Sequence, residues 1–342
     1  MKDDIINKSG RAHLRRGAPV QPFAELTPER VLEAAEAAGL APDGRLLALN
    51  SYENRVYRLG SAAGFRVFKF YRPGRWSDAQ ILEEHAFSAE LADEELPVAT
   101  PIAIGGRTLF RHAGFRFAAF ECLPGREPEL DAPGARELLG RTLARIHQVG
   151  ARSAFVRRPA IDPDRYGVQA RRVVLGSPLL PSALSENYAR LSEQVLERIE
   201  RVYGEVAPVA LIRVHGDCHL GNLLWAQTGP RFVDLDDCAM GPRIQDLWML
   251  LSGEPAEQQA QWAELIGGYE QFASLEYPQL RLIEPLRALR MLHHAAWVCE
   301  RWADPAFPRA FPWFGEARHW EGYLRDLAEQ LSAIDEPPLL AR

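Results

Sequence analysis

One short stretch of the sequence, residues 214–237, constrains the fold more than any other part of the chain. It contains the letters HGDCHLGN over residues 215–222 and FVDLDD over residues 232–237. Apolar runs typical of short buried strands flank both segments. The fold must therefore bring two polar loops together at the ends of short strands.

The polar residues of these loops are the types that transfer of a phosphoryl group from ATP requires. One carboxylate orients the attacking hydroxyl, while an Asn and a second Asp hold Mg²⁺ against the phosphates. We predict that Asp217 is the catalytic base and that Asn222 and Asp234 bind Mg²⁺, with Asp234 also serving catalysis. A loop Asp is common in isolation, but the complete pattern of both segments favours the functional interpretation.

Two further carboxylates follow Asp234 at Asp236 and Asp237. Acidic groups packed this closely disfavour each other's ionisation unless a cation neutralises them. The pattern therefore favours a nearby metal ion, but it does not decide whether Asp236 contacts that ion directly.

The overall composition is that of an ordinary globular protein. The chain has 342 residues, of which 47% are hydrophobic and 25% charged, and its formal net charge is −6. This length suits a two-lobed unit or two domains. The charge gives no reason to expect a nucleic-acid partner, and no apolar run is long enough to cross a membrane.

The chain carries no sign of secretion. Residues 1–20 are polar and partly basic, without the apolar core of a secretory signal, so we expect a disordered tail. The four cysteines show no CxxC spacing, which favours reduced thiols in the cytoplasm and argues against a zinc site.

Residues 21–121 have the pattern of a β-rich lobe. A capped helix begins after Thr27 and ends near Gly39, and a second helix is expected over 79–91. The expected strands are 46–49, 55–59, 65–70, 97–104 and 115–121. This order is typical of the N-terminal, ATP-binding lobe of a kinase-like fold, and residues 122–126, which include Pro124 and Gly125, would form the hinge.

Residues 127–338 are mostly helical in pattern and would form the C-terminal catalytic and substrate lobe. The expected helices are 135–149, 185–203, 244–252, 256–272, 282–303 and 316–334, with a less regular segment at 151–185. The whole chain is therefore predicted to be α+β, with a two-lobed protein-kinase-like fold.

A strand lysine, Lys69, is the candidate contact for the ATP phosphates. Strand alternation turns its side chain away from Phe68 and Phe70. Glu83 and Glu84 lie on the following helix, and a Lys–Glu pair of this kind holds the α- and β-phosphates in kinase folds. We prefer Glu84, because apolar residues would place the other face of its helix against the core. These residues are Ile81, Leu82 and Phe87.

The turn at residues 50–55 joins the first two strands, where kinases place the loop that covers the phosphates. It contains no glycine, but backbone N–H groups and a Ser hydroxyl can still bind phosphate. Ser51 is the first choice for an ATP contact and Asn54 the second. At the hinge, the backbone groups of Glu121 and Leu123 would bind adenine.

Two residues near the catalytic loop are expected to support it rather than to react. His215 would pack and form hydrogen bonds that hold the loop, and Asp246 would bind its backbone. The aromatic segment near the C-terminus is expected to pack against the C-terminal lobe. It comprises Trp302, Phe307, Phe311, Trp313, Phe314 and Trp320.

Together these segments resemble the aminoglycoside phosphotransferase and choline kinase-like superfamily and, within it, the bacterial stress response kinase A family of Ser/Thr protein kinases. The resemblance covers about residues 25–338. The matching letters are LNSYENRVY at 49–57, KFYRP at 69–73, ILEEH at 81–85, QDLWMLL at 245–251 and RWADPAFP at 301–308, besides 215–222 and 232–237.

This resemblance implies Mg²⁺- and ATP-dependent phosphorylation of Ser or Thr in a protein substrate, with autophosphorylation, as part of a stress response. From the composition and the cysteines we also expect a cytoplasmic protein without membrane or nucleic-acid partners, and we expect it to be a monomer. Nothing in the composition or spacing shows that the acceptor is a protein.

Two alternatives stay open. A kinase acting on an amino alcohol, sugar or antibiotic would share every catalytic residue, although the excess of Arg over acidic residues in 151–185 disfavours a polycationic substrate. A non-catalytic nucleotide-binding scaffold would be expected to lack part of the set Lys69, Asp217, Asn222 and Asp234, and all four are present.

Overall fold

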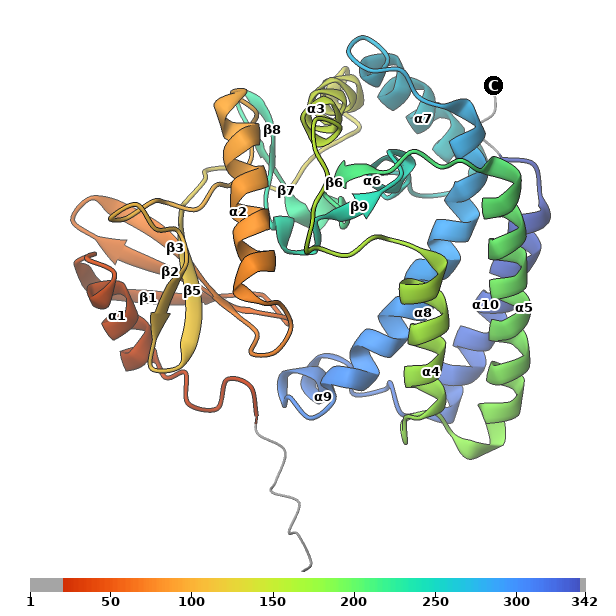
Figure 1. Cartoon of the computed structure of the whole chain (residues 1–342), viewed down its shortest axis with the longest axis horizontal. Coiled ribbons are helices and arrows are strands. Elements are labelled where there is room, and N and C mark those ends of the chain that lie inside the picture. Colours follow the sequence, from red (N-terminus) through yellow and green to blue (C-terminus); the bar gives the residue numbers. More distant parts are fainter. Residues whose placement is uncertain (1–20, 339–342) are drawn as a thin grey trace, which may run out of the picture.

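The computed structural model describes residues 21–338, so the tail predicted at 1–20 lies outside the described residues. A five-stranded antiparallel sheet forms the N-terminal part, in the order β1-β2-β3-β5-β4 (Figure 1). Its strands are β1 (Pro42–Leu49), β2 (Arg55–Ser61), β3 (Gly64–Tyr71), β4 (Phe110–His112) and β5 (Phe115–Glu121). The predicted strands 46–49, 55–59, 65–70 and 115–121 are confirmed.

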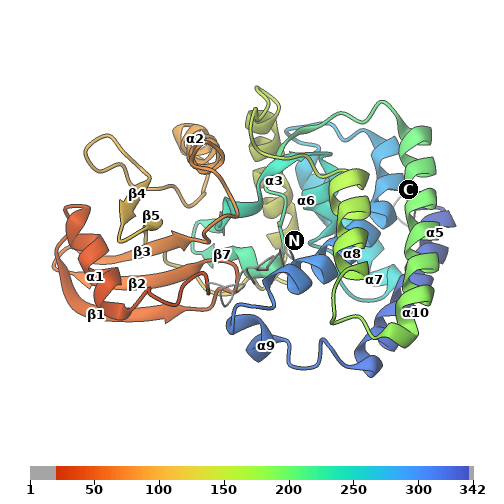
Figure 2. The ribbon, with the colours of Figure 1, turned by 60° about the horizontal axis from the view of Figure 1, so that its bottom comes forward.

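Two helices, α1 (Pro28–Ala37) and α2 (Asp78–Asp93), cover opposite faces of this sheet (Figure 2). Phe68, Phe70 and Phe117 point to the α1 face, where they form one apolar cluster with that helix. Lys69 alternates with these aromatic residues and therefore points to the α2 face. This alternation brings the strand lysine and the α2 carboxylates together.

The strand predicted at 97–104 is wrong. This segment forms only isolated bridges, from Val98 to Phe232 and from Pro101 to Phe120 among others, and the edge of the sheet is the short β4. Pro97 and Pro101 have no N–H to donate, so a regular ladder cannot continue through the segment.

The C-terminal part is mostly helical. Its helices are α3 (Ala135–Gly150), α4 (Ala170–Leu175), α5 (Ser182–Val206), α6 (Ile244–Trp248), α7 (Pro255–Tyr269), α8 (Ile283–Arg301), α9 (Ala306–Ala310) and α10 (Ala317–Asp335). The segment 151–185 is more regular than expected, because a π-helical turn at Asp164–Gln169 leads directly into α4. One large apolar cluster joins these helices.

Two small sheets within the helical part hold the loops of interest. One pairs β6 (Ile212–Val214) with β9 (Ala239–Gly241), and the other pairs β7 (Leu223–Ala226) with β8 (Gly229–Phe232). The strands β6, β7 and β8 form from the apolar runs that were expected beside the two polar loops, although no bounds were predicted for them. The short helix α9 was not predicted. The β-rich N-terminal part and helical C-terminal part confirm the predicted α+β, two-lobed kinase-like class.

The segment between the two parts follows the end of β5 at Glu121. Residues 122–126 begin without helix or strand, and the N–H of Arg126 then donates to the carbonyl of Trp225 in β7 at 3.0 Å. The division into lobes at 21–121, 122–126 and 127–338 stays a prediction. No helix of the described residues is long and apolar enough to cross a membrane.

Candidate active site

The loop after β6 is held by one buried carboxylate, that of Asp246 at the start of α6. Its oxygens accept the N–H groups of His215 at 2.7 Å and Gly216 at 2.9 Å, and His147 Nε2 lies 3.1 Å away. Burial opposes ionisation of Asp246, but the hydrogen bond and charge of His147 outweigh it and lower the pKa of the carboxyl. The geometry matches the expected support of the loop backbone.

Gly216 is required in this loop. Its φ is +85°, and a Cβ atom there would lie 2.2 Å from the carbonyl oxygen of Asp237. The close approach places the loop of Asp217 directly beside the segment that contains Asp234.

Asp217 lies in the loop directly after β6, and its side chain is partly exposed. Its Oδ1 is 2.6 Å from Nη1 of Arg290 on α8, and its Oδ2 is 3.3 Å from Nε2 of His219. Burial opposes ionisation, but the hydrogen bond from His219 and the charge of Arg290 lower the pKa of Asp217 well below its usual range. The carboxylate is therefore ionised and available to orient a hydroxyl.

Asn222 and Asp234 are joined through the backbone, because the N–H of Val233 donates to the Asn222 carbonyl at 3.0 Å. The side-chain Nδ2 of Asn222 donates to the carbonyl oxygen of Asp217 at 2.9 Å, so the amide oxygen is the atom left to bind a cation. Asp234 has a left-handed φ of +59°, and its side chain is 48% exposed.

These two residues fit a Mg²⁺ site of the kind completed by phosphates and water. Mg²⁺ typically takes one or two carboxylates from the protein and its other oxygens from substrate and solvent. The described residues contain no group of three or more His, Cys, Asp or Glu that could hold a metal without such help. The donors therefore suit a nucleotide-bound cation rather than a permanent structural ion.

Lys69 is buried among three carboxylates, those of Glu84, Asp234 and Asp236. Its Nζ lies 3.3 Å from Glu84, 2.9 Å from Asp234 and 3.0 Å from Asp236. Burial alone would favour the neutral amine, but these three charges raise the pKa of Lys69 well above its usual value. The lysine is thus a fixed cation next to the predicted metal ligand.

The structure selects Glu84 as the partner of Lys69, but for a different reason from the one expected. Leu82 is 46% exposed, and the face of α2 that packs inward carries Ile81, Glu84 and Phe87 together. Glu83 points elsewhere and accepts the backbone N–H groups of residues 156–158 at 2.8 to 3.0 Å.

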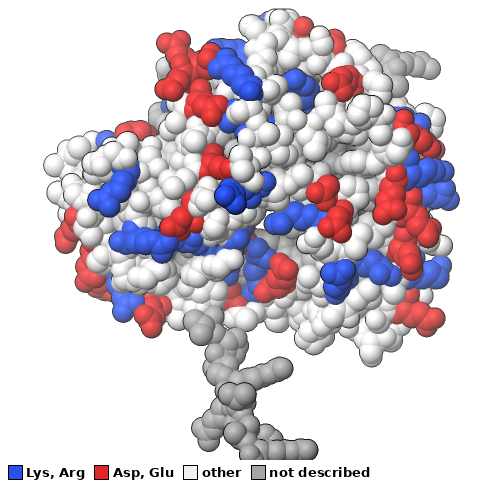
Figure 3. All heavy atoms as spheres, in the orientation of Figure 1, with Lys and Arg blue, Asp and Glu red and all other residues white. Residues whose placement is uncertain are grey.

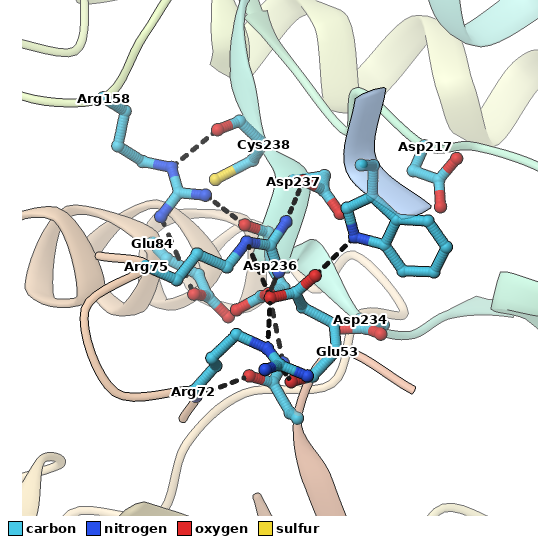
Figure 4. Close-up of polar contacts among 12 residues, drawn as sticks. Glu53, Arg72, Arg75, Glu84, Arg158, Asp217, Asp234, Asp236, Asp237 and Cys238 are labelled. Carbon is cyan, nitrogen blue, oxygen red and sulfur yellow. Dashed lines mark hydrogen bonds and ion pairs between the residues drawn. The ribbon is translucent and has the colours of Figure 1, made fainter. Parts of the chain in front are cut away.

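The expectation that these carboxylates favour a nearby metal ion stays a prediction, because protein cations also neutralise part of their charge. Asp236 is buried and is neutralised by protein cations, since Lys69 and Arg75 both form ion pairs with it. Arg158 donates to the backbone carbonyl of Cys238 at 2.6 Å and lies 3.8 Å from Glu84 (Figure 4). The roles of Arg75, Arg158 and Arg290 were not predicted, because no recognisable local pattern surrounds these residues in the sequence.

The nucleotide contacts proposed from the sequence lie at the ends of the expected strands. Ser51 is partly exposed in the turn between β1 and β2. Asn54 is buried, with Nδ2 donating to Asp236 at 3.1 Å and Oδ1 accepting the N–H of Arg72, so its amide is not free for ATP. Glu121 ends β5, with Leu123 just beyond it. The roles assigned to Ser51, Glu121 and Leu123 stay predictions.

The comparisons with known proteins agree with this architecture. The sequence pattern of the Phosphotransferase enzyme family matches residues 45–283, and the chain belongs to this family. It is therefore a phosphotransferase.

The most similar relatives show to which branch of the phosphotransferase family the chain belongs. "Stress response kinase A" of Escherichia coli O157:H7 is 43% identical over 318 residues, covering 93% of this chain and 96% of that protein. "Serine/threonine protein kinase RdoA" of Salmonella typhimurium is 42% identical with the same coverage. The chain belongs to the stress response kinase A family, as its resemblance implied.

Solved structures share the fold at lower identity. An amicoumacin kinase in complex with AMP-PNP, Ca²⁺ and amicoumacin ("Ami") superimposes with a TM-score of 0.68 at 22% identity, covering 91% of this chain and 94% of that one. A microcompartment-associated aminopropanol kinase gives a TM-score of 0.68 at 19% identity, covering 89% and 98%. These likenesses confirm the kinase-like fold.

Proposed function

We propose that the chain is an ATP- and Mg²⁺-dependent Ser/Thr protein kinase of a bacterial stress response, able to phosphorylate itself. The observation that carries this proposal is the convergence of Asp217, Asn222 and Asp234 on two adjoining loops beside the buried Lys69. The relatives' names support a protein acceptor and a stress response. A cytoplasmic monomer is part of the proposal.

Each side chain has a role that follows from its surroundings. Asp217, ionised and partly exposed, aligns the acceptor hydroxyl and accepts its proton. The amide oxygen of Asn222 and the carboxylate of Asp234 would hold Mg²⁺, which when bound would neutralise charge on the phosphates. Lys69, fixed by Glu84, contacts the α- and β-phosphates, while Ser51 and the hinge backbone bind the rest of the nucleotide.

The test is transfer of labelled phosphate from ATP in the presence of Mg²⁺, comparing the wild-type chain with Asp217→Asn. Acceptors are the protein itself, a generic Ser/Thr protein substrate and a panel of small alcohols. The matched control is Asp131→Asn, which changes a surface carboxylate whose side chain is 97% exposed.

Label on protein Ser or Thr that disappears in Asp217→Asn, while ATP binding persists, would support the proposal. Label only on a small alcohol would instead identify a metabolite or antibiotic kinase with the same site. ATP binding without any transfer would favour the scaffold alternative, and full activity of Asp217→Asn would overturn the assignment of the base.

A further inference from the structure

The turn at residues 50–55 is held by the C-terminal helices, far away in the sequence. Its central side chain, Glu53, is mostly buried, and its carboxylate lies 2.6 Å from Nε of Arg301 on α8. The indole N–H of Trp297, also on α8, donates to the same carboxylate. Figures 1 and 2 show α9, which follows α8, at the edge of the helical part that faces the sheet.

A second set of contacts passes through Arg72, just after β3. Its Nε–H donates to the carbonyl of Glu53 at 2.9 Å, and Nη2 donates to Asp304 at 2.8 Å. Asp304, between α8 and α9, is buried and also accepts from Arg55 at 3.0 Å. One carboxylate of the helical part therefore holds both the end of the turn and the guanidinium that binds its backbone.

The same turn is linked to the segment of the predicted metal ligand. Nε of Arg75 lies 3.7 Å from Glu53, while its other nitrogens form ion pairs with Asp236 and Asp237 (Figure 4). Figure 3, drawn in the orientation of Figure 1, shows basic and acidic side chains close together across the middle of that face of the molecule. We call the group around the turn the Glu53 cluster. It consists of Glu53, Arg55, Arg72, Arg75, Trp297, Arg301 and Asp304.

A turn that merely connected two strands would not need such a cluster. Removing charged groups from water costs several kcal/mol each, so a buried ion-pair network is weak evidence for stability alone. A phosphate-covering loop rich in glycine can adapt its backbone to the nucleotide, whereas the turn at 50–55 contains no glycine. Its backbone must be held in place by side-chain contacts instead, and the Glu53 cluster supplies them.

We propose that Glu53 and Asp304 are positioning residues that fix the turn at 50–55 over the ATP phosphates, so that α8 and the segment directly after it set the affinity for the nucleotide. Neither residue touches the reacting atoms. This inference rests on the proposed ATP-dependent function, because it assigns the turn to the phosphates.

The test uses the full chain and the variants Glu53→Gln, Asp304→Asn and Arg301→Gln. The control is Glu300→Gln, which removes the 52% exposed partner of Arg301 on its outer side. Three quantities are measured: the Kd for ATP with Mg²⁺ by calorimetry, the separate KM values for ATP and acceptor, and amide hydrogen exchange at residues 50–55.

We expect about tenfold weaker ATP binding, about tenfold higher KM for ATP, faster exchange at 50–55 and an unchanged KM for the acceptor. Glu300→Gln should match the wild type. If a buried variant does not fold, Arg301→Gln, at the end of α8, decides the question. Folded variants with wild-type exchange and ATP affinity would overturn the positioning role, whereas a wild-type chain that binds no ATP would overturn the proposed function itself.

Discussion

At the scale of single residues, the surroundings of Asp217 define how it can act. A carboxylate whose pKa is lowered by Arg290 and His219 is a weak proton acceptor. In a loose phosphoryl-transfer transition state the attacking hydroxyl keeps its proton until late, so orientation matters more than basicity. The hydrogen bond from His219 and the charge of Arg290 both favour the ionised carboxylate, and the Arg290 contact also fixes its orientation.

Arg290→Gln should lower kcat at pH 7 by about tenfold, because the Asp217 carboxylate stays ionised but loses the contact that fixes its orientation. Steady-state kinetics check this, with Arg287→Gln on the same helix as control. A wild-type kcat in Arg290→Gln would contradict the role of Arg290.

The adjacent residues Glu83 and Glu84 should give different phenotypes. Glu84→Gln removes the charge that fixes Lys69 and should lower kcat by about 10- to 100-fold. Glu83→Gln should leave kcat per folded molecule unchanged but lower the free energy of unfolding by about 1–3 kcal/mol, since three N–H groups lose a charged acceptor. Kinetics and urea unfolding of both variants test the contrast; equal losses of kcat would contradict it.

At the scale of elements, the sequence predicted the helices and strands whose residues show a clear local pattern. Alternation identified β1, β2, β3 and β5, and helical spacing identified α2, α3, α5, α7, α8 and α10. No bounds were predicted for β6 and β9, which have only three residues each and no visible period. The cationic side chains that contact the site were not predicted, for another reason. They are Arg75, Arg158 and Arg290, and they contact residues distant in the sequence, which no local pattern encodes.

The loop directly after β6, which contains His215 and Gly216, should depend on Asp246 for its stability. Asp246→Asn replaces a double acceptor with a group that has one acceptor oxygen, so one buried N–H of His215 or Gly216 loses its partner. We expect the free energy of unfolding at pH 7 to fall by about 2–4 kcal/mol.

The pH dependence gives a second test of Asp246. Its folded-state pKa lies below the unfolded value of about 3.9, so its stabilisation is present above that value and is lost as pH falls through the folded-state pKa. Urea unfolding from pH 7 down to pH 3 should show a smaller loss of stability in Asp246→Asn than in the wild type. An equal loss of unfolding free energy between pH 7 and pH 3 in the two proteins would contradict the stabilising role of ionised Asp246.

At the scale of the whole molecule, ion pairs connect the sheet with α8, with Asp304 just after α8, and with the loops of Asp217 and Asp234. Lys69 and Arg75 from the N-terminal part both contact Asp236 in the C-terminal part. A nucleotide bound beside this network would contact both parts at once, so its binding energy should stabilise both against unfolding.

ATP should therefore raise the unfolding temperature of the whole chain, and only with a divalent cation. At 100 times its Kd, a ligand that binds only the folded state adds about 2.7 kcal/mol, which corresponds to roughly 4 °C for a chain of this size. Differential scanning calorimetry with Mg²⁺–ATP should show this shift in a single transition. EDTA should abolish it, and Asp234→Asn should reduce it strongly, because that variant removes the carboxylate ligand of the cation. A full shift in EDTA would mean that the nucleotide binds without metal and that Asn222 and Asp234 have another role.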